Sequence, residues 1–277
     1  MDLGESQRQS KNIFGSGKSV EMRNITLQGK ALVAEYRKVY GNRTVLAFSR
    51  GKDSIATALW LIKNGLEIVP VHYDMVPGLP FIEESLAYYE RTLFDGRRIL
   101  RFPHPSCYHF LNSTLYQTAG TAQVIAAANL VSPVAQSWYR DINGWACDEA
   151  GIDEDILTAN GMRARDSPAR WMSFRRHGAI RPSACAWCPI WEWTKGMIVE
   201  AIEQSSVSLP IDYLWFGRTF DGLDARFLVP LKRHSPRDWA ALCDWYPLAE
   251  MECWKYERFV EGKHAGTDRV RVQRDCA

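Results

Sequence analysis

The feature that most constrains the fold of this chain is a short apolar run followed directly by a polar turn near residue 50. Residues 44–48 have the β-branched and apolar character of a buried strand. Apolar side chains recur at helical spacing over residues 55–62, and Asn64-Gly65 ends that pattern. A strand, a tight turn and a helix are therefore predicted in that order. The turn reads Ser49-Arg50-Gly51-Lys52-Asp53-Ser54.

The same alternation continues along the chain. A helix is predicted over residues 27–40, and further strands over residues 68–73 and 98–102 enclose a helix that begins near residue 82. Strands separated by helices imply right-handed crossovers and a parallel sheet. Pro70 weighs against a central second strand, because a proline cannot donate to the hydrogen-bond ladder.

The rest of the chain is expected to extend and cover this sheet. We predict mostly helix over residues 107–150, a short strand over 156–159, and helices over 194–204 and after Pro236. The expected fold class is α/β, a doubly wound, Rossmann-like parallel sheet with a C-terminal helical extension. The expected divisions are a flexible arm over residues 1–24, an α/β domain over 25–180 and the extension over 181–277.

Composition limits the class of protein. The 277 residues carry a formal net charge of +2, too small to indicate a nucleic-acid binder by itself, so any basic surface must be local. Residues 163–181 are a candidate, with six arginines set beside Trp171 and Phe174. No apolar run approaches the length of a membrane span, and no secretory signal is visible. Seven cysteines without a disulfide-like spacing favour a reducing, cytoplasmic location.

The predicted turn lies where parallel sheets bind ligands, outside the carboxyl ends of their strands. Unpaired N–H groups and the positive dipole end of the helix favour phosphate there. Gly51 permits a tight turn, Ser49 and Ser54 can donate hydrogen bonds, and Lys52 supplies a positive charge. Asp53 caps the helix or helps to hold Mg²⁺. The alternative is an ordinary polar turn without a ligand.

This loop resembles the Ser-Gly-Gly-Lys-Asp-Ser loop of the PP-loop ATP pyrophosphatase superfamily, whose fold is adenine nucleotide alpha hydrolase-like. That superfamily includes phosphoadenosine phosphosulfate reductases, ATP sulfurylase small subunits and nucleic-acid thiolation enzymes. Arg50 departs from the pattern, because it stands where the superfamily has its first glycine. If the position requires a positive φ angle, arginine is strained. If it does not, the guanidinium could add a contact to phosphate.

Two further segments resemble the superfamily in the same chain order. Val71-His72-Tyr73-Asp74 resembles the end of its second strand, where an acidic residue stands near the nucleotide. Residues 161–167 with Arg170 resemble the Gly-x-Arg-x-x-Glu-Ser stretch and trailing arginine of the phosphoadenosine phosphosulfate reductase-like branch, with Asp166 in place of the glutamate. Arg163 and Arg170 suit a bidentate grip on phosphate or sulfate. A structural ion-pair cluster is the alternative.

The resemblance implies ATP and Mg²⁺ as ligands. An acceptor oxygen would attack the α-phosphorus of ATP and pyrophosphate would leave, with Lys52, Asp53 and Arg163 as the catalytic residues. Asp53 or Asp74 would hold the metal. The implied nucleotide-binding residues are Ser49, Arg50, Gly51, Lys52, Asp53, Ser54, Asp74, Arg163 and Arg170. The expected acceptor is a nucleic acid, modified by thiolation or another step, and the expected protein partner is a second copy of the chain or a sulfur donor.

Cys185 and Cys188 are the only closely spaced cysteines. Two thiolates this close can share Zn²⁺ or an iron–sulfur cluster, cycle through a disulfide, or simply pack. One pair is half of a tetrahedral site, so Cys107 or Cys147 would have to complete it, with His177 as another candidate. Cys185, Cys188 and Cys107 are the candidate ligand set.

Two other functions remain open. A sulfonucleotide reductase resembles this chain but adds a C-terminal Glu-Cys-Gly-x-His nucleophile, whereas the sequence here ends Arg-Asp-Cys-Ala, so the cysteine pair would have to replace it. The third hypothesis is a non-catalytic nucleotide-binding partner subunit, in which Arg50 marks a loop that binds without turnover. The polar and aromatic residues 212–218 are expected either to pack as a loop or to line the acceptor site.

Overall fold

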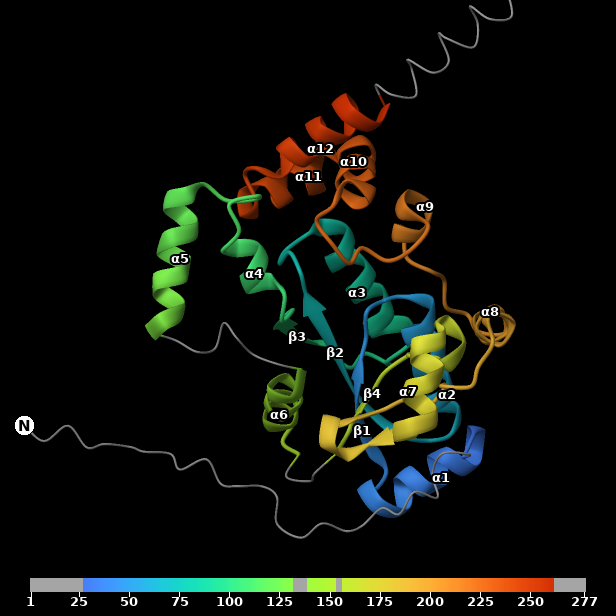
Figure 1. Ribbon diagram of the computed structural model, residues 1–277. Helices are drawn as coiled ribbons and strands as arrows, with labels where there is room; N and C mark the ends of the chain where they lie inside the picture. Colours follow the sequence, from blue (N-terminus) through green and yellow to red (C-terminus); the bar gives the residue numbers. More distant parts are fainter. Residues whose placement is uncertain (1–26, 132–138, 153–155, 262–277) are drawn as a thin grey trace, which may run out of the picture.

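A computed structural model describes residues 27–131, 139–152 and 156–261 (Figure 1). The arm predicted over residues 1–24 and the tail cysteine, Cys276, lie outside the described residues. Within those residues, no helix is both long enough and apolar enough to cross a membrane.

Among the described residues, six strands form one sheet in the order β3-β2-β1-β4-β6-β5. Every neighbouring pair is parallel except β5 with β6. The strands are β1 (Arg43–Ala47), β2 (Glu67–Asp74), β3 (Leu100–Pro103), β4 (Thr158–Ala159), β5 (Ile180–Arg181) and β6 (Ala186–Trp187). The predicted strands at the positions of β1 to β4 are confirmed, whereas the two short strands β5 and β6 were not predicted.

Pro70 lies inside β2 without breaking the sheet. The C=O of Val71 accepts a hydrogen bond from the N–H of Phe48 on the β1 side, at 2.7 Å. The backbone N–H and C=O groups of neighbouring strand residues point toward opposite neighbouring strands. Those at position 70 therefore point toward β3. Pairing with β3 begins only at Val71, opposite Leu100, so the missing N–H of Pro70 leaves no ladder bond unmade.

Helices alternate with the strands and then accumulate toward the C-terminus. The α-helices are α1 (Gly29–Tyr40), α2 (Lys52–Lys63), α3 (Pro80–Thr92), α4 (Cys107–Leu111), α5 (Ala119–Val131), α6 (Tyr139–Glu149), α7 (Pro168–His177), α8 (Lys195–Glu203), α9 (Asp212–Phe216), α10 (Ala225–His234), α11 (Pro236–Trp245) and α12 (Ala249–Tyr256). Short 3₁₀ turns, η3 (Ala164–Asp166) and η4 (Pro182–Ala184), and a π turn, η5 (Glu257–Glu261), complete the described chain. The helices predicted from periodicity are confirmed within the described residues, and residues 132–138 of the helical stretch predicted over 107–150 lie outside them.

Helices cover both faces of the sheet. The side chains of neighbouring strand residues point to opposite faces, so each face contributes to its own apolar core. Leu46 of β1 belongs to the main core together with Ile55 of α2 and Leu86 of α3. Its neighbour Val45 belongs to a second core with Ile142 of α6. The expected doubly wound α/β fold with a helical C-terminal part is therefore what the structure shows.

Helix α1 and strand β6 are held together by aromatic packing. Trp187 of β6 is fully buried, and its ring stacks on Tyr36 of α1 with centroids 4.0 Å apart. Its indole N–H donates to the hydroxyl of Thr44 in β1 at 2.9 Å, so the buried indole has its partner. This packing places residues 180–187 firmly within the sheet, so the boundary drawn at residue 180 from sequence passes through β5.

The C-terminal helices α10, α11 and α12 pack on one another, and α11 also contacts α3. They lie together at the end of the molecule away from α1, drawn in orange to red (Figure 1). The segment over residues 211–220, which includes α9, precedes these helices, and α9 packs on α10. That segment connects the C-terminal helices to the candidate site.

Candidate functional site

The direction of the strand order reverses beside β1. After β1 the chain moves outward to β2 and β3, and then returns to place β4 on the other side of β1. Ligands of open α/β sheets bind at such a switch point, outside the carboxyl ends of the strands. The loop after β1, residues 48–51, and the loop after β4, residues 160–163, flank this position. Both are segments that the sequence analysis singled out.

The two loops approach each other closely at Gly161. A Cβ atom placed on Gly161 would lie 2.8 Å from the backbone carbonyl carbon of Asp53 and 2.9 Å from its oxygen. Only a glycine fits at this distance, because a backbone atom cannot move aside as a flexible side chain can. The contact therefore explains the glycine that opens the segment over residues 161–167.

Arg50 adopts a left-handed conformation, with φ of 63°. The sequence analysis gave two outcomes for this position, strain or an extra contact to phosphate, and the observed φ is the one that strains a residue with a side chain. The arginine side chain is fully buried. Its Nη1 and Nη2 donate to the two carboxylate oxygens of Asp212 at 2.9 and 3.0 Å, and its guanidinium lies 5.6 Å from the ring centroid of Phe81. The guanidinium is thus committed to the protein interior.

Asp212 is the first residue of α9 and is itself fully buried. Besides Arg50, it accepts a hydrogen bond from the N–H of Phe220 at 2.9 Å, which closes residues 212–220 into a compact loop. We call residues 212–220 the α9 loop. A buried bidentate pair with a further donor satisfies the buried carboxylate, and it joins the α9 loop to the turn after β1.

The α9 loop makes two more contacts with that turn. The hydroxyl of Tyr213 accepts a hydrogen bond from the N–H of Lys52, the first residue of α2, at 2.8 Å. A Cβ on Gly51 would lie 3.2 Å from the hydroxyl of Thr219, so that side chain sits directly over the glycine. One of the N–H groups expected to receive phosphate therefore already has a partner in this structure.

The two loop serines hydrogen-bond within the loop. The hydroxyl of Ser54 donates to the C=O of Gly51 at 2.9 Å, and the hydroxyls of Ser49 and Ser54 lie 3.2 Å apart. Gly51, the N-cap residue before α2, has an extended backbone, and its N–H donates weakly to the hydroxyl of Ser49 at 3.4 Å. Ser49 is exposed, so its hydroxyl is the one accessible to a ligand.

Asp53 and Arg163 meet across the switch point. The Nε of Arg163 lies 2.9 Å from Oδ1 of Asp53, while Lys52 contacts the other carboxylate oxygen. Although they form an ion pair, Oδ1 and Nε lack the alignment of a hydrogen bond, and both atoms are buried. Two unsatisfied polar atoms beside the loop are the kind of site where a ligand supplies the missing partners.

Asp166 connects this pair to α7. Its two oxygens accept from Arg163 Nη2 at 2.5 Å and from Arg170 Nη1 at 2.6 Å, and Oδ2 also accepts from the N–H of Arg163 at 3.2 Å. Arg163 is buried, whereas the side chain of Arg170 is 48% exposed. Arg163, Asp166 and Arg170 thus form an ion-pair cluster in this structure, which was the alternative to a phosphate site. The cluster lies against the loop over residues 49–54.

Asp74, at the end of β2, belongs to a separate network. Arg101 of β3 binds both oxygens of Asp74, at 2.6 and 2.9 Å, and also contacts Glu83 of α3. Burial raises the pKa of Asp74, and the bonds to Arg101 oppose that effect. The side chain of Asp74 is 9% exposed and that of Asp53 is 30% exposed, so Asp74 is less accessible to a metal than Asp53 is.

His72 supports the strand end that leads into the loop. Its Nδ1 lies 2.9 Å from the C=O of Phe48, and since a carbonyl only accepts, Nδ1 carries the proton. Burial, followed by the nearby charge of Arg50, lowers the pKa of His72 to about 3. The ring is therefore neutral near pH 7 and acts as a hydrogen-bond donor to the backbone.

The candidate metal ligands are not brought together. Among the described residues, no group of three or more His, Cys, Asp or Glu side chains is arranged to hold a metal ion. Cys188 is fully buried, its thiol lies 3.0 Å from Oδ1 of Asn160, and burial raises its pKa to about 12. Cys107, on α4, lies 3.9 Å from the hydroxyl of Tyr246 instead. Cys185, on the turn before β6, has φ of 48°. These thiols do not form a site that fits a zinc ion or an iron–sulfur cluster.

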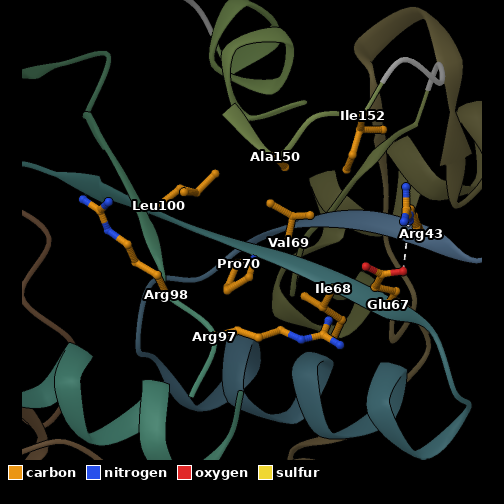
Figure 2. A pocket seen from close by; sticks show the side chains of 10 residues that line it. All are labelled: Arg43, Glu67, Ile68, Val69, Pro70, Arg97, Arg98, Leu100, Ala150 and Ile152. Atoms are coloured by element: carbon orange, nitrogen blue, oxygen red, sulfur yellow. Dashed lines mark hydrogen bonds and ion pairs between the residues drawn. The ribbon is translucent and has the colours of Figure 1, made fainter. Parts of the chain in front are cut away.

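A pocket of about 210 Å³ lies at the opposite edge of the sheet (Figure 2). Arg43 and Glu67, the first residues of β1 and β2, line it as an ion pair, and Arg97 and Arg98, just before β3, line it from the next strand. It is therefore at the amino ends of the strands. Since ligands of parallel sheets bind at the carboxyl ends, we locate the candidate site at the switch point and not in this pocket.

The fold and the site define an α/β protein with a tight loop and a cluster of charged side chains at its topological switch point. No protein-family model matches the chain, and no curated protein matches it. Among solved structures it is similar to the U34-tRNA thiolase NcsA from Methanococcus maripaludis, described with its [4Fe-4S] cluster. The identity is 14%, 80% of each chain is covered, and the TM-score is 0.39. This likeness supports no inference about activity.

The α9 loop is the part of the site whose role was not predicted. Residues 212–218 were noted as polar and aromatic, but nothing in the spacing tied Asp212 to Arg50, 162 positions earlier. A signal was nevertheless present. An arginine replacing a glycine inside a buried turn needs an acidic partner, because an unpaired charge there is costly.

Proposed function

We propose that the chain binds ATP at the loop over residues 49–54 and transfers its adenylyl group to an acceptor, as a cytoplasmic PP-loop ATP pyrophosphatase resembling the phosphoadenosine phosphosulfate reductase-like branch. The observation that carries the proposal is the meeting of Asp53 and Arg163 across the switch point, with one unsatisfied polar atom on each.

In this proposal the loop holds the β- and γ-phosphates. The N–H groups of the first turn of α2 have no partners within the helix and point toward the phosphate position, and the side chains of Lys52 and Ser49 add donors. Arg163 neutralises charge that develops on the phosphates. Arg50 acts through Asp212 to hold the turn, so its side chain has a positioning role and its backbone shapes the loop.

The chemical step is displacement at phosphorus. An acceptor oxygen forms a bond to the α-phosphorus, the bond from that phosphorus to the bridging oxygen of the β-phosphate breaks, and pyrophosphate leaves with the electron pair. Asp53 suits Mg²⁺, because Oδ1 lacks a hydrogen-bond partner and carboxylate oxygens are preferred ligands of that ion. When bound, Mg²⁺ neutralises charge on the departing pyrophosphate. Catalysis then depends mainly on positioning and charge stabilisation.

The acceptor class that we propose is a nucleic acid, which would be adenylated and then open to a second nucleophile such as sulfide or an amine. A sulfur-donating protein would then be a partner. Sulfonucleotide reduction has less support, since the cysteine pair would have to replace the missing nucleophile and one of its two thiols is inaccessible. The Cys188 thiol is buried and, with a pKa of about 12, protonated at neutral pH.

A second candidate is nucleotide binding without turnover. It is favoured by the hydrogen bond from the N–H of Lys52 to Tyr213, which occupies a donor that the phosphates would need. The two candidates differ in one measurable product, pyrophosphate.

The test compares two lysines of the same helix. Lys52 begins α2 beside the loop, and Lys63 is an exposed residue at its other end. We expect Lys52→Ala to weaken ATP binding, measured by calorimetry, by about 10-fold or more, since a charge-assisted contact contributes roughly 1.5–3 kcal/mol. Lys63→Ala should bind like the wild type. Equal ATP affinity in the Lys52 variant would remove the proposed site.

Turnover is tested separately, by release of pyrophosphate from ATP in the presence of single-stranded RNA or DNA. Release by the wild type, and a loss of release in Arg163→Gln that exceeds its loss of ATP affinity, would support the catalytic proposal. Tight ATP binding without release under any acceptor would favour the binding-only candidate instead.

A further inference from the structure

Helix α7 presents an exposed face that combines aromatic, apolar and basic side chains. Its members are Trp171, Met172, Arg175 and Arg176, which we call the α7 face. Trp171 is 47% exposed and Met172 is 61% exposed, and both arginines are exposed as well. A single exposed apolar residue is ordinary on a protein surface, but here an exposed ring, an exposed thioether and two basic side chains lie together on one helix face, which is the composition of an interaction surface.

The ring of Trp171 is held by its neighbour. The guanidinium carbon of Arg175, one turn later, lies 5.2 Å from the ring centroid. This cation–π contact restricts the indole and leaves almost half of that side chain accessible. The arrangement is a partly ordered aromatic platform with a positive charge attached to it.

Positive charge is concentrated around this face. Residues 163–181 contain six arginines and one acidic residue, Asp166, whereas the whole chain has a net charge of only +2. Asp166 is already paired with Arg163 and Arg170. The acidic side chain of this segment therefore does not neutralise Arg175 or Arg176.

The opposite side of α7 fixes the helix on the protein. Phe174 is buried and packs on Trp191, with ring centroids 5.5 Å apart, and Arg181 covers Phe174 at 4.5 Å. The Ser167 side chain caps the first turn by accepting from the N–H of Arg170. The α7 face is thus carried by a rigid element.

The same helix begins at the candidate site. Arg170, in its first turn, is joined through Asp166 to Arg163, and Arg163 is paired with Asp53 beside the loop. A polymer lying along the α7 face would therefore have one end near the position where the α-phosphorus of ATP is expected.

We propose that the α7 face binds single-stranded nucleic acid, the acceptor of the adenylyl group, with Arg175 and Arg176 on backbone phosphates and Trp171 stacked on a base. This inference rests on the proposed function for the identity of the reaction, but not for the binding itself. Charge complementarity selects a polyanion, and stacking on an exposed indole selects unpaired bases, since a duplex keeps the faces of its bases covered.

The experiment measures binding of a fluorescein-labelled single-stranded RNA to the full chain by fluorescence anisotropy. Trp171→Ala should weaken binding by about 10-fold, as expected for the loss of one stacked base, and Trp171→Phe should retain most of the affinity. Arg176→Gln should reduce the slope of log affinity against log salt by about 0.7, the value for one lost contact to a single-strand phosphate.

Matched controls lie elsewhere on the surface. Trp254 on α12 is 50% exposed, and Arg97 before β3 is exposed at the opposite edge of the sheet. Trp254→Ala and Arg97→Gln should leave RNA affinity and its salt slope unchanged. Unchanged binding in both α7 variants, equal losses in the controls, or equal affinity of the wild type for a blunt duplex would overturn the proposal.

ATP binding by the same variants separates the two proposals. The α7 variants should bind ATP like the wild type, because none of the substituted residues contacts the loop. If the wild type bound RNA through the α7 face but failed to bind ATP, the proposed function would be wrong and the assignment of the α7 face to RNA binding would be supported. If it bound ATP and the α7 variants bound RNA normally, only the surface assignment would be wrong.

Discussion

Arg50 and Asp212 form a bidentate ion pair, at 2.9 and 3.0 Å, in which neither side chain is exposed to solvent. The arginine holds a left-handed conformation that glycine would adopt at lower cost. The strain is tolerated because the guanidinium joins the turn after β1 to the α9 loop. The turn is thereby shaped by a segment from the far end of the chain.

We expect Asp212→Asn to destabilise the protein by about 3–5 kcal/mol. The substitution leaves the buried guanidinium of Arg50 without its counter-charge, and an unpaired buried charge is much more costly than the pair is beneficial. The free energy of unfolding in urea measures the effect. The double variant Arg50→Gly with Asp212→Asn should recover most of the loss, since it removes both the charge and the strained φ angle. A single variant as stable as the wild type would contradict this account of the pair.

Removing the hydroxyl of Tyr213 should strengthen ATP binding. In this structure that hydroxyl accepts from the N–H of Lys52, so bound phosphate must displace it. Tyr213→Phe frees the donor, and a net hydrogen-bond contribution of about 1 kcal/mol corresponds to roughly fivefold tighter binding. Calorimetric titration with ATP is the measurement. Weaker binding would instead mean that the hydroxyl contacts the nucleotide.

Two glycines should respond oppositely to alanine. A Cβ at Gly161 would lie 2.8 Å from the backbone of Asp53, so Gly161→Ala forces the two loops apart and should cost about 1–3 kcal/mol. Gly144, inside α6, has open space around the added atom, and Gly144→Ala should stabilise the protein by about 1 kcal/mol through helix propensity. Thermal unfolding of both variants checks the contrast. Similar effects in the two would argue against a close approach at Gly161.

Much of the sheet could be predicted from sequence because local patterns determine it. The apolar run of β1, the helical spacing of α2 and the β-rich run of β2 are properties of neighbouring residues. The strands β5 and β6 were not found this way, since Ile180-Arg181 and Ala186-Trp187 stand in no apolar or alternating run, whereas the equally short β4 ends the apolar run Ile156-Leu157. Their pairing depends on burial of Trp187 against Tyr36, a contact between distant parts of the chain.

The candidate site also has a part that sequence patterns predict and a part that they do not. The loop over residues 49–54 and the segment over residues 161–167 were both predicted because each is a motif of contiguous residues. The partners that decide what these residues do lie elsewhere: Asp212 for Arg50, Tyr213 for Lys52, and Arg101 for Asp74. Such pairings between distant positions have no period and no spacing, so sequence patterns could not show them. The predicted roles in nucleotide binding stay predictions until binding is measured.

The two closely spaced cysteines should differ in reactivity. Cys188 is fully buried and its pKa is raised to about 12, so almost none of it is thiolate at pH 8, whereas Cys185 is partly exposed. Iodoacetamide should therefore modify Cys185 well before Cys188 in the native protein, as followed by peptide mass spectrometry. Equal rates in the folded chain would be inconsistent with the buried thiol, and protection of both by an added metal ion would revive a metal site.

The buried His72 should make the protein less stable in acid. Its pKa is about 3 in the folded chain and near 6.5 when unfolded, so between these pH values the unfolded state binds the additional proton. Stability contributed by the neutral ring is fully present above pH 6.5 and decreases as the pH falls, by about 1.4 kcal/mol per pH unit down to about pH 3. Urea unfolding at several pH values would reveal this slope. In His72→Asn, whose amide can still donate to the C=O of Phe48, the slope should decrease by that amount, even if the variant is less stable at every pH. An unchanged slope would mean that His72 is not held neutral, and that its bond to the strand end before the loop tolerates protonation.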